Sequence, residues 1–462
     1  MTNPKPLDQR LIEKPRDFVY NNVLLTAQNF ARIEASSGIV LVLAAVVALI
    51  WANSPWDESY FDLLHTHIDI DAEIVHLELS IQHWINDGLM VIFFFLMGLE
   101  IKRELVHGEL SSPRRALLPA MAALGGMVFP AAIYLAFNAG GEGSDGWGVP
   151  VATDIAFALG VLSLLSRRIP SSVRVFLLAL AIADDIGGIL VIAIFYTADI
   201  SFLAMGIAAL IFGLLFVFNR AGVRAINIYV FLGVLLWVAV HESGIHATIA
   251  GVILGLLTPA VAYYNRETFA ESAQDLASRY KIAHEAGSSS VQASILSQME
   301  DLVKGTEAPL DRLEHALVRW VSFTIVPVFA LANAGVAISG DIASDAISSP
   351  VSQGIAAGLV LGKPFGIFLF SALAIKLGLC DLPRGSNFRQ VFGVGILGGI
   401  GFTVSLLITD LAFRDNALFA DEAKLGVLFA SIVAAVVGLV FLMFSGSQQQ
   451  SSQEEPAPGG HH

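Results

Sequence analysis

Cysteine and charged residues are both scarce in this sequence of 462 residues. Its single cysteine, Cys380, excludes an internal disulfide and any metal cluster built on cysteine. Charged residues make up only 14% of the chain and apolar residues 55%, more than a water-soluble domain needs for its core. We therefore expect an integral membrane protein. A formal net charge of −14 without a basic patch argues against binding to nucleic acid.

Apolar runs long enough to cross a bilayer, which takes roughly 20 residues, recur along the chain. Most basic residues fall in alternate segments between these runs, which predicts an even number of spans with both termini in the cytoplasm. We predict an all-α polytopic membrane protein with about twelve transmembrane helices. The runs lie near residues 37–53, 84–101, 116–138, 148–165, 173–197, 201–219, 225–241, 244–257, 316–338, 352–376, 390–412 and 423–444.

Four segments outside the spans have distinct compositions. Residues 67–82 alternate apolar and polar side chains with a period of two, which predicts a short external β-hairpin. Residues 259–315 are predicted to be a cytoplasmic insert with helical stretches that break at "EAGSSS". Residues 1–36 are expected to be a cytoplasmic N-terminal segment, and residues 445–462 a disordered tail because they lack the apolar content to fold.

Ionisable residues inside the predicted spans are candidates for function, because a charge at the bilayer centre costs roughly 2.5–3.5 kcal/mol on insertion scales. The strongest candidates are the adjacent Asp184 and Asp185, since one buried lysine neutralises only one carboxylate. Lys363 is that lysine, and an unpaired ammonium would be costly, so we predict that it contacts Asp184. Asp154 lies in another span, whereas Asp87 lies near a span end and either stays buried or reaches the membrane interface.

Two spans contain residues that interrupt helices near the middle of the membrane. "GWGVPVATD" places glycines and a proline ahead of Asp154, and "GVGILGGIGFT" is rich in glycine. Each is the middle span of a triplet, residues 115–197 and 352–444, and the two triplets are predicted to be inverted repeats. Broken helices at corresponding positions are typical of a transporter site. Where they cross, Asp154 would balance the positive helix ends and Lys363 the negative ends.

Eight motifs follow one another along the chain: "WINDGLMVIFFFLMGLEIKREL", "ATDIAFALGVLSLL", "LALAIADDIGGILVIAIFYT", "SGIHATIAGVILG", "RLEHAL", "FALANAGV", "LGKPFGI" and "GILGGIGFTVSLLI". Together they resemble the NhaA family of sodium/proton antiporters over residues 32–444. The resemblance implies an electrogenic secondary transporter, not an enzyme, that exports Na⁺ or Li⁺, imports H⁺ and uses no cofactor.

The resemblance also implies roles for individual residues. Asp184 and Asp185 would bind Na⁺ and H⁺ with Lys363 as the partner of Asp184, and Asp154 with Thr153 would balance charge at the crossing. Positions linked to a pH response would be Glu100, Arg103, Glu104, His246, Glu314 and His315. The sequence departs from the family pattern in a longer insert after "TPA" and in lacking a second histidine after "LEH", which affects the pH response alone.

The same resemblance divides the transmembrane region, residues 37–444, into two parts. The two triplets would form a core, and residues 37–114 and 198–338 would form an interface part. The protein would be a homodimer in the bacterial inner membrane, in contact with lipid and joined through the hairpin at residues 67–82.

Three other classes of protein fit parts of this pattern. A sodium-coupled organic solute symporter of similar fold is the main alternative, and it would need a cavity for an organic substrate. An intramembrane aspartyl protease is disfavoured because adjacent helical residues project about 100° apart and do not share a proton face to face. A channel would need a continuous pore.

Overall fold

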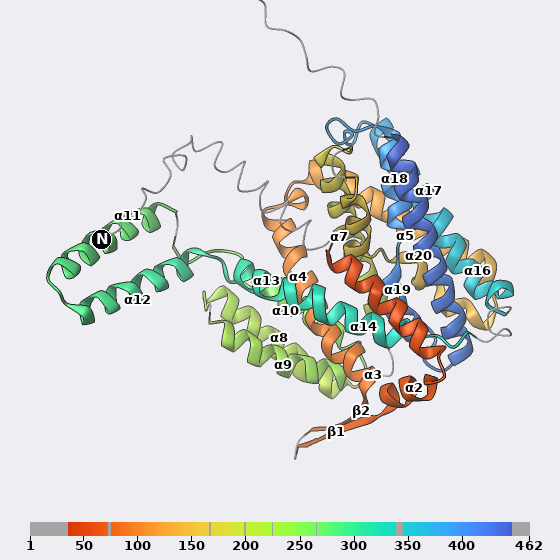
Figure 1. The fold of residues 1–462 in the computed structure, drawn as a ribbon, viewed down its shortest axis with the longest axis horizontal. Coiled ribbons are helices and arrows are strands. Elements are labelled where there is room, and N and C mark those ends of the chain that lie inside the picture. Colours follow the sequence, from red (N-terminus) through yellow and green to blue (C-terminus); the bar gives the residue numbers. More distant parts are fainter. Residues whose placement is uncertain are drawn as a thin grey trace, which may run out of the picture.

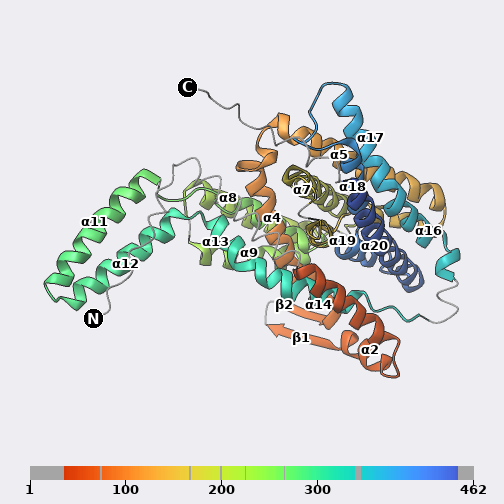
Figure 2. The ribbon, with the colours of Figure 1, turned by 45° about the horizontal axis from the view of Figure 1, so that its top comes forward.

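The computed structural model describes residues 36–72, 75–165, 168–197, 200–223, 225–264, 266–338 and 345–445. The predictions for the N-terminal segment and the C-terminal tail fall on residues 1–35 and 446–462, which lie outside this part of the chain. The described residues are mostly helical, and Figures 1 and 2 show the helices packed side by side in one body with a hairpin at its edge.

Within the described residues, seven helical stretches are long and apolar enough to cross a membrane. In three of them a π-helical turn joins two α-helices, and the other four are single α-helices. The stretches are α3, η2 and α4 (Ile81–His83, Trp84–Leu89, Met90–Val106), α5 (Pro113–Asn138), α7 (Ser171–Phe195), α8 (Phe202–Arg220), α13, η5 and α14 (Pro309–Trp320, Val321–Ile325, Val326–Asn333), α16, η6 and α17 (Pro350–Ala357, Gly358–Gly362, Lys363–Lys376) and α20 (Ala417–Ser445).

Three further helix pairs are bent at a short break, and two apolar helices are shorter. The pairs are Ser36–Ala52 with α2 (Asp57–His65), bent by 112°, η4 (Glu142–Val151) with α6 (Ile155–Ser163), bent by 44°, and α18 (Phe388–Gly398) with α19 (Phe402–Ala412), bent by 45°. The shorter helices are α9 (Ile226–His241) and α10 (Thr248–Leu257). Every predicted apolar run thus overlaps a helix or bent pair, although the runs 244–257 and 316–338 extend beyond α10 and α14, and twelve crossings remain a prediction.

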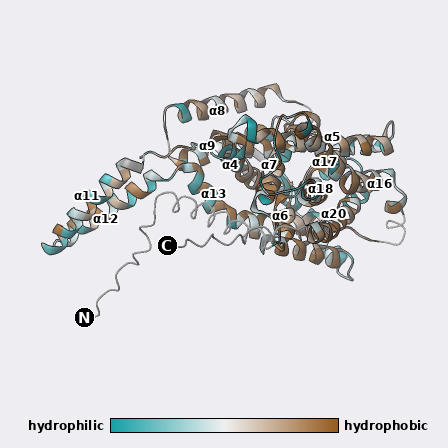
Figure 3. Ribbon diagram, turned by 90° about the horizontal axis from the view of Figure 1, so that it is seen from above, coloured by the Kyte–Doolittle hydropathy of each residue, from teal (hydrophilic) through white to brown (hydrophobic). Residues whose placement is uncertain are grey.

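The outer surface of the helical body is apolar, as expected for helices that face lipid chains. On α8 the side chains of Phe202, Leu203 and Leu210 are 78%, 79% and 72% exposed. Figure 3 shows hydrophobic residues over the helical body and hydrophilic residues concentrated on two helices that project from it. Multiple apolar helices with exposed apolar faces support a multi-pass membrane protein.

The projecting helices are α11 (Arg266–Glu285) and α12 (Ser289–Thr306), within the predicted insert. They pack against each other through a small core that includes Leu276 and Ile295. The turn between them contains Gly287 at a φ of 69°, a conformation that glycine adopts without a steric cost. The break therefore lies within "EAGSSS", as the sequence indicates.

Residues 67–72 and 75–80 form the sheet in the described chain, and Ile81 and Gln82, at the end of the predicted hairpin, begin α3 instead. Strands β1 (His67–Ala72) and β2 (Val75–Ser80) pair in antiparallel register from His67 opposite Ser80 to Ala72 opposite Val75. The hairpin lies next to α2 and α3, at the same end of the helical body (Figures 1 and 2).

Close contact between α5 and α17 positions Lys363 in the interior. Gly125 of α5 and Gly366 of α17 meet backbone to backbone, and a Cβ on either would collide with the opposite carbonyl. Gly126 leaves room for Ile367 in the same way, beside the stem of Lys363. Small residues thus let the two helices approach, and the Lys363 side chain is 0% exposed.

Candidate ion-binding site

Two of the three bent pairs, η4 with α6 and α18 with α19, meet at their breaks. Between η4 and α6 the helix stops over residues 152–154, and between α18 and α19 it stops near residues 399–401. The amide of Asp154 donates to the carbonyl of Ile400 at 2.6 Å, and the hydroxyl of Thr153 donates to the carbonyl of Gly398 at 2.8 Å. Each break therefore uses backbone groups that an unbroken helix would have paired internally.

The half η4 is a 3₁₀ helix, whereas the other three halves are α-helical. Its glycines lie where a side chain would not fit. A Cβ at Gly146 would collide with Tyr134 and Phe413, and a Cβ at Gly148 would collide with Tyr196. The glycines that predicted a break from the sequence thus also allow close packing around it.

Asp154 caps two half-helices at once. Its Oδ1 accepts from the amide of Phe157 at 2.9 Å, at the start of α6. Its Oδ2 accepts from the amide of Thr403 at 3.2 Å and from the Thr403 hydroxyl at 2.7 Å, at the start of α19. The carboxylate is 3% exposed, so its charge lies against the positive ends of both helices with little solvent screening.

Lys363 makes the complementary contact. Its Nζ lies 2.5 Å from Asp184 Oδ2 and donates to Thr153 Oγ1 at 3.0 Å. Because the Thr153 hydroxyl donates onward to Gly398, the ammonium is linked to a carbonyl at the C-terminus of α18. A positive charge there is favourable, since helix C-termini carry partial negative charge.

Asp185 has a different environment from its neighbour on α7. It lines a cavity of about 60 Å³ and is 7% exposed. One oxygen of each carboxylate, Asp184 Oδ1 and Asp185 Oδ2, has no hydrogen-bond partner among the described residues. The structure thus separates the two carboxylates: Asp184 Oδ2 is held by Lys363, and Asp185 faces the cavity.

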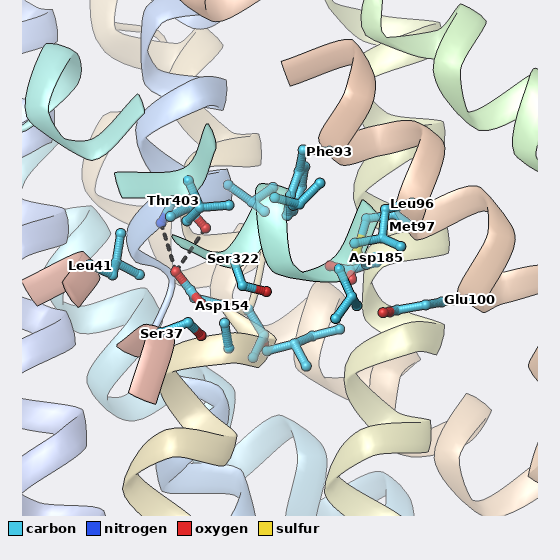
Figure 4. Close-up of a pocket in the computed structure, with 17 residues that line it drawn as sticks. Ser37, Leu41, Phe93, Leu96, Met97, Glu100, Asp154, Asp185, Ser322 and Thr403 are labelled. Atoms are coloured by element: carbon cyan, nitrogen blue, oxygen red, sulfur yellow. Dashed lines mark hydrogen bonds between the residues drawn. The ribbon is translucent and has the colours of Figure 1, made fainter. Parts of the chain in front are cut away.

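Figure 4 shows Asp185 and Glu100 at one end of this cavity, Asp154 and Thr403 at the other, and Ser322 between them. Apolar side chains of the helix Ser36–Ala52, of α4 and of η5 complete the wall. This volume is the space open to the centres of water molecules, and one water needs about 10–15 Å³ of it, so the space has room for a small cation with a few water molecules. It is far below the roughly 300–1,000 Å³ of sites that take up organic ligands.

Five of the six residues assigned to a pH response lie on the second half of α4 and in the middle of α13. Glu100 is buried, and Arg103 makes an ion pair with Glu314 across the two helices. Glu104 accepts from the amide of Glu109 at 2.9 Å. Since Glu100 and Asp185 line the same cavity, this group of charges reaches the cavity that Asp185 faces.

The two histidines of that set do not join this group of charges. His315 follows Glu314 on α13 but is exposed, with Nδ1 3.4 Å from Glu307 Oε1. His246 is buried near the start of α10, with Nε2 3.7 Å from Asp87 Oδ1 and Nδ1 beside the hydroxyl of Thr248. Asp87 itself is only partly buried, with a side chain 20% exposed, and does not line the cavity.

Three polar residues that line the cavity have no role in the sequence interpretation: Ser37, Ser322 and Thr403. Thr403 follows directly after the break in "GIGFT". Its position, a hydroxyl side chain in the first turn of a half-helix, could have marked it in the sequence. Ser322 lies in the π-helical turn η5, and no sequence pattern marks that turn.

Comparison with known proteins decides the family. Residues 28–442 match the family described as Na⁺/H⁺ antiporter 1. The chain belongs to this family. The Na⁺/H⁺ antiporter NhaA of Sulfurimonas denitrificans is 46% identical over 433 residues, covering 93% of this chain and 98% of the relative. The Na⁺/H⁺ antiporter NhaA of Koribacter versatilis is 48% identical over 414 residues, covering 89% and 90%.

A solved structure supports the fold of this Na⁺/H⁺ antiporter 1 member. The sodium proton antiporter MjNhaP1 from Methanocaldococcus jannaschii superposes with a TM-score of 0.51 at 12% identity, covering 92% of this chain and all of that one. Family membership predicted from the motifs is confirmed, and sodium/proton antiport is the activity of that family.

Proposed function

We propose that this protein is an electrogenic antiporter that exports Na⁺ or Li⁺ in exchange for H⁺ at Asp185, with Asp184 and Lys363 as a coupled pair. One observation carries the proposal: Asp185 alone of the two adjacent carboxylates faces the small cavity, while Asp184 is held by Lys363. The site needs no cofactor, because the transported ions themselves are the ligands.

Exchange follows from competition for the same oxygen atoms. A carboxylate binds either a proton or a hard cation through its lone pairs, and the cavity has room for a small ion. An empty site with a bare, buried carboxylate is costly to move across a membrane. Only loaded forms then cross, so that Na⁺ movement in one direction is coupled to H⁺ movement in the other.

Electrogenic exchange needs a second group that carries a proton, because one proton against one Na⁺ moves no net charge. Lys363 is suited to this role. A cation that contacts Asp184 as well as Asp185 would compete with the ammonium for the Asp184 carboxylate. Weakening that contact favours loss of the lysine proton, since a buried ammonium without a partner is costly.

Alternating access would move the core against the interface part. The cavity wall supports this division, because Asp154 and Asp185 come from the core, residues 115–197 and 352–444. Glu100 and Ser322 come from the interface part, residues 37–114 and 198–338. A site between two parts can be opened first to one side and then to the other by sliding one part past the other.

The finer assignments are part of the same proposal. The protein would lie in the bacterial inner membrane with both termini in the cytoplasm and an inverted repeat in its core. Glu100, Arg103 and Glu314 would adjust activity to pH, because Glu100 links their charges to the cavity. The hairpin would join a homodimer, since two strands alone leave open edges. The small cavity argues against an organic solute symporter.

The test uses everted membrane vesicles with an acidic interior and a pH-sensitive dye. Addition of Na⁺ or Li⁺ should release protons from the interior. If two protons leave for each cation that enters, net positive charge leaves the vesicle, so the release should grow as the interior becomes more positive. The absence of any response to either cation from neutral to alkaline pH would contradict the proposal. A response that requires an added organic solute would favour the symporter.

A further inference from the structure

Four polar side chains outside the cavity form a network between distant segments. Asn86 of η2 donates to Asp410 Oδ2 of α19 at 3.0 Å and to Asn333 Oδ1 of α14 at 3.1 Å. Asn333 donates back to Asn86 Oδ1 at 2.8 Å. Lys424 Nζ of α20 lies 3.0 Å from Asp410 Oδ1. We call these four residues the polar latch.

The polar latch crosses the boundary between the two proposed parts. Asn86 and Asn333 belong to the interface part, and Asp410 and Lys424 belong to the core. The hydrogen bond from Asn86 to Asp410 is the direct link between them. By contrast, the Asn86–Asn333 bonds and the Lys424–Asp410 ion pair each stay within one part.

The latch and the cavity lie at different levels along the helix axis. On the continuous stretch η2–α4, Asn86 precedes the first cavity residue, Phe93, by about 10 Å at 1.5 Å of rise per residue. Between the two levels lie buried apolar side chains of the main core, including Met90, Phe329 and Ile408. The latch therefore covers the side of the site opposite Glu100.

The chemistry of the latch suits a contact that opens repeatedly. Lys424 and Asp410 are 11% and 19% exposed, close enough to solvent for water to replace their partners when the parts separate. Replacing a hydrogen bond between two side chains by hydrogen bonds to water changes the free energy little. Separating two apolar surfaces would instead expose them to water, which is unfavourable.

We propose that the polar latch holds core and interface part together on the side opposite Glu100, and that its Asn86–Asp410 link breaks once in every exchange cycle. The inference rests on the proposed alternating access. Beyond alternating access, it identifies the contact that closes the cavity on the side opposite Glu100. No residue of the latch lines the cavity, so its role is in the movement of the two parts and not in ion binding.

Two cysteine pairs in a Cys380→Ser background test this. The pair Asn86→Cys with Asp410→Cys joins the two parts, and the pair Asn86→Cys with Asn333→Cys stays within the interface part. Both replace side chains that contact each other, and both contain the same first substitution. Vesicles carrying each pair are oxidised, the free thiols are counted with a maleimide, and sodium-driven proton release is measured before oxidation, after it and after reduction.

We expect the pair across the parts to lose at least tenfold in exchange rate on oxidation and to recover on reduction, while the pair within one part keeps its rate. Continued exchange with Asn86→Cys fully cross-linked to Asp410→Cys would overturn the latch. An equal loss of exchange rate in both pairs on oxidation would overturn it too. So would a result in which Asn86→Cys cross-links to Asn333→Cys but not to Asp410→Cys. Antiport itself is read separately, from proton release by the parent protein and by the reduced variants.

Discussion

Asp184 and Asp185 follow one another on α7, but their carboxylates meet different partners: Asp184 lies 2.5 Å from the ammonium of Lys363, and Asp185 faces the cavity. Consecutive residues of a helix project about 100° apart, so one helix presents two carboxylates to two environments. In the proposed exchanger Asp185 binds the ion, and Asp184 has a partner, Lys363, that can respond to the bound ion.

Replacement of Lys363 should lower stability strongly. Lys363→Ala leaves the carboxylate of Asp184 buried without its cation, which typically costs about 3–5 kcal/mol. Thermal unfolding in detergent measures the change. Lys376→Ala is the matched control, because Lys376 ends the same helix and is exposed. The double variant with Asp184→Asn should recover part of the loss, and unchanged thermal stability in Lys363→Ala alone would contradict the importance of the pair.

Neutralisation of Asp185 should abolish transport without unfolding the protein. Asp185→Asn keeps the side-chain shape and one oxygen, but it loses the charge that binds Na⁺ and the site that carries the proton. Sodium-driven proton release in vesicles should fall to background, while thermal stability stays near that of the parent. Asp415→Asn, the same change at an exposed acid, should keep full exchange. Robust exchange by Asp185→Asn would mean that another group is the shared site.

Competition also predicts the pH dependence of sodium affinity. A proton on Asp185 blocks Na⁺, so the apparent Na⁺ affinity should rise with pH by about tenfold per unit while the site is mostly protonated, and then level off. Sodium titrations of proton release at several pH values measure this. An affinity that stays constant across the whole range would rule out competition at one carboxylate.

Asp154 should contribute to stability through both helix starts that it caps. Asp154→Ala removes acceptors for Phe157 and Thr403, and each lost cap costs about 1–2 kcal/mol. Thr403→Val removes only the hydroxyl contact, so it should cost less than Asp154→Ala. Thermal unfolding of the two variants decides the order, and the reverse order would show that the carboxylate does not serve both helices.

Removal of the hairpin should weaken a dimer while leaving transport by each protomer. Strands β1 and β2 pair only with each other among the described residues, so their outer edges are open to a second copy. Replacing residues 67–80 by a short glycine–serine linker should lower the dimer fraction seen by cross-linking. Proton release per protomer should persist, because the cavity contains no hairpin residue. An unchanged dimer fraction would place the contact elsewhere.

Local patterns were enough to predict the helices and their breaks. The apolar runs give helices because a membrane leaves no other partner for backbone groups, and every run overlaps a helix or bent pair. Gly146, Gly148 and Pro150 marked one break, and the glycines before Thr403 marked the other. The alternation in residues 67–82 indicated strands, and β1 and β2 occupy that segment.

Contacts between distant residues depended on the tertiary structure. The sequence itself determined that carboxylates and a lysine lie in apolar helices, where the cost of a bare charge demands partners. Only the packing of α5 against α17 and the crossing of the broken helices decided that Lys363 reaches both Asp184 and Thr153. Only packing decided that His246 lies apart from Glu100, because helix periodicity orients side chains around their own axis and leaves open which helix lies opposite.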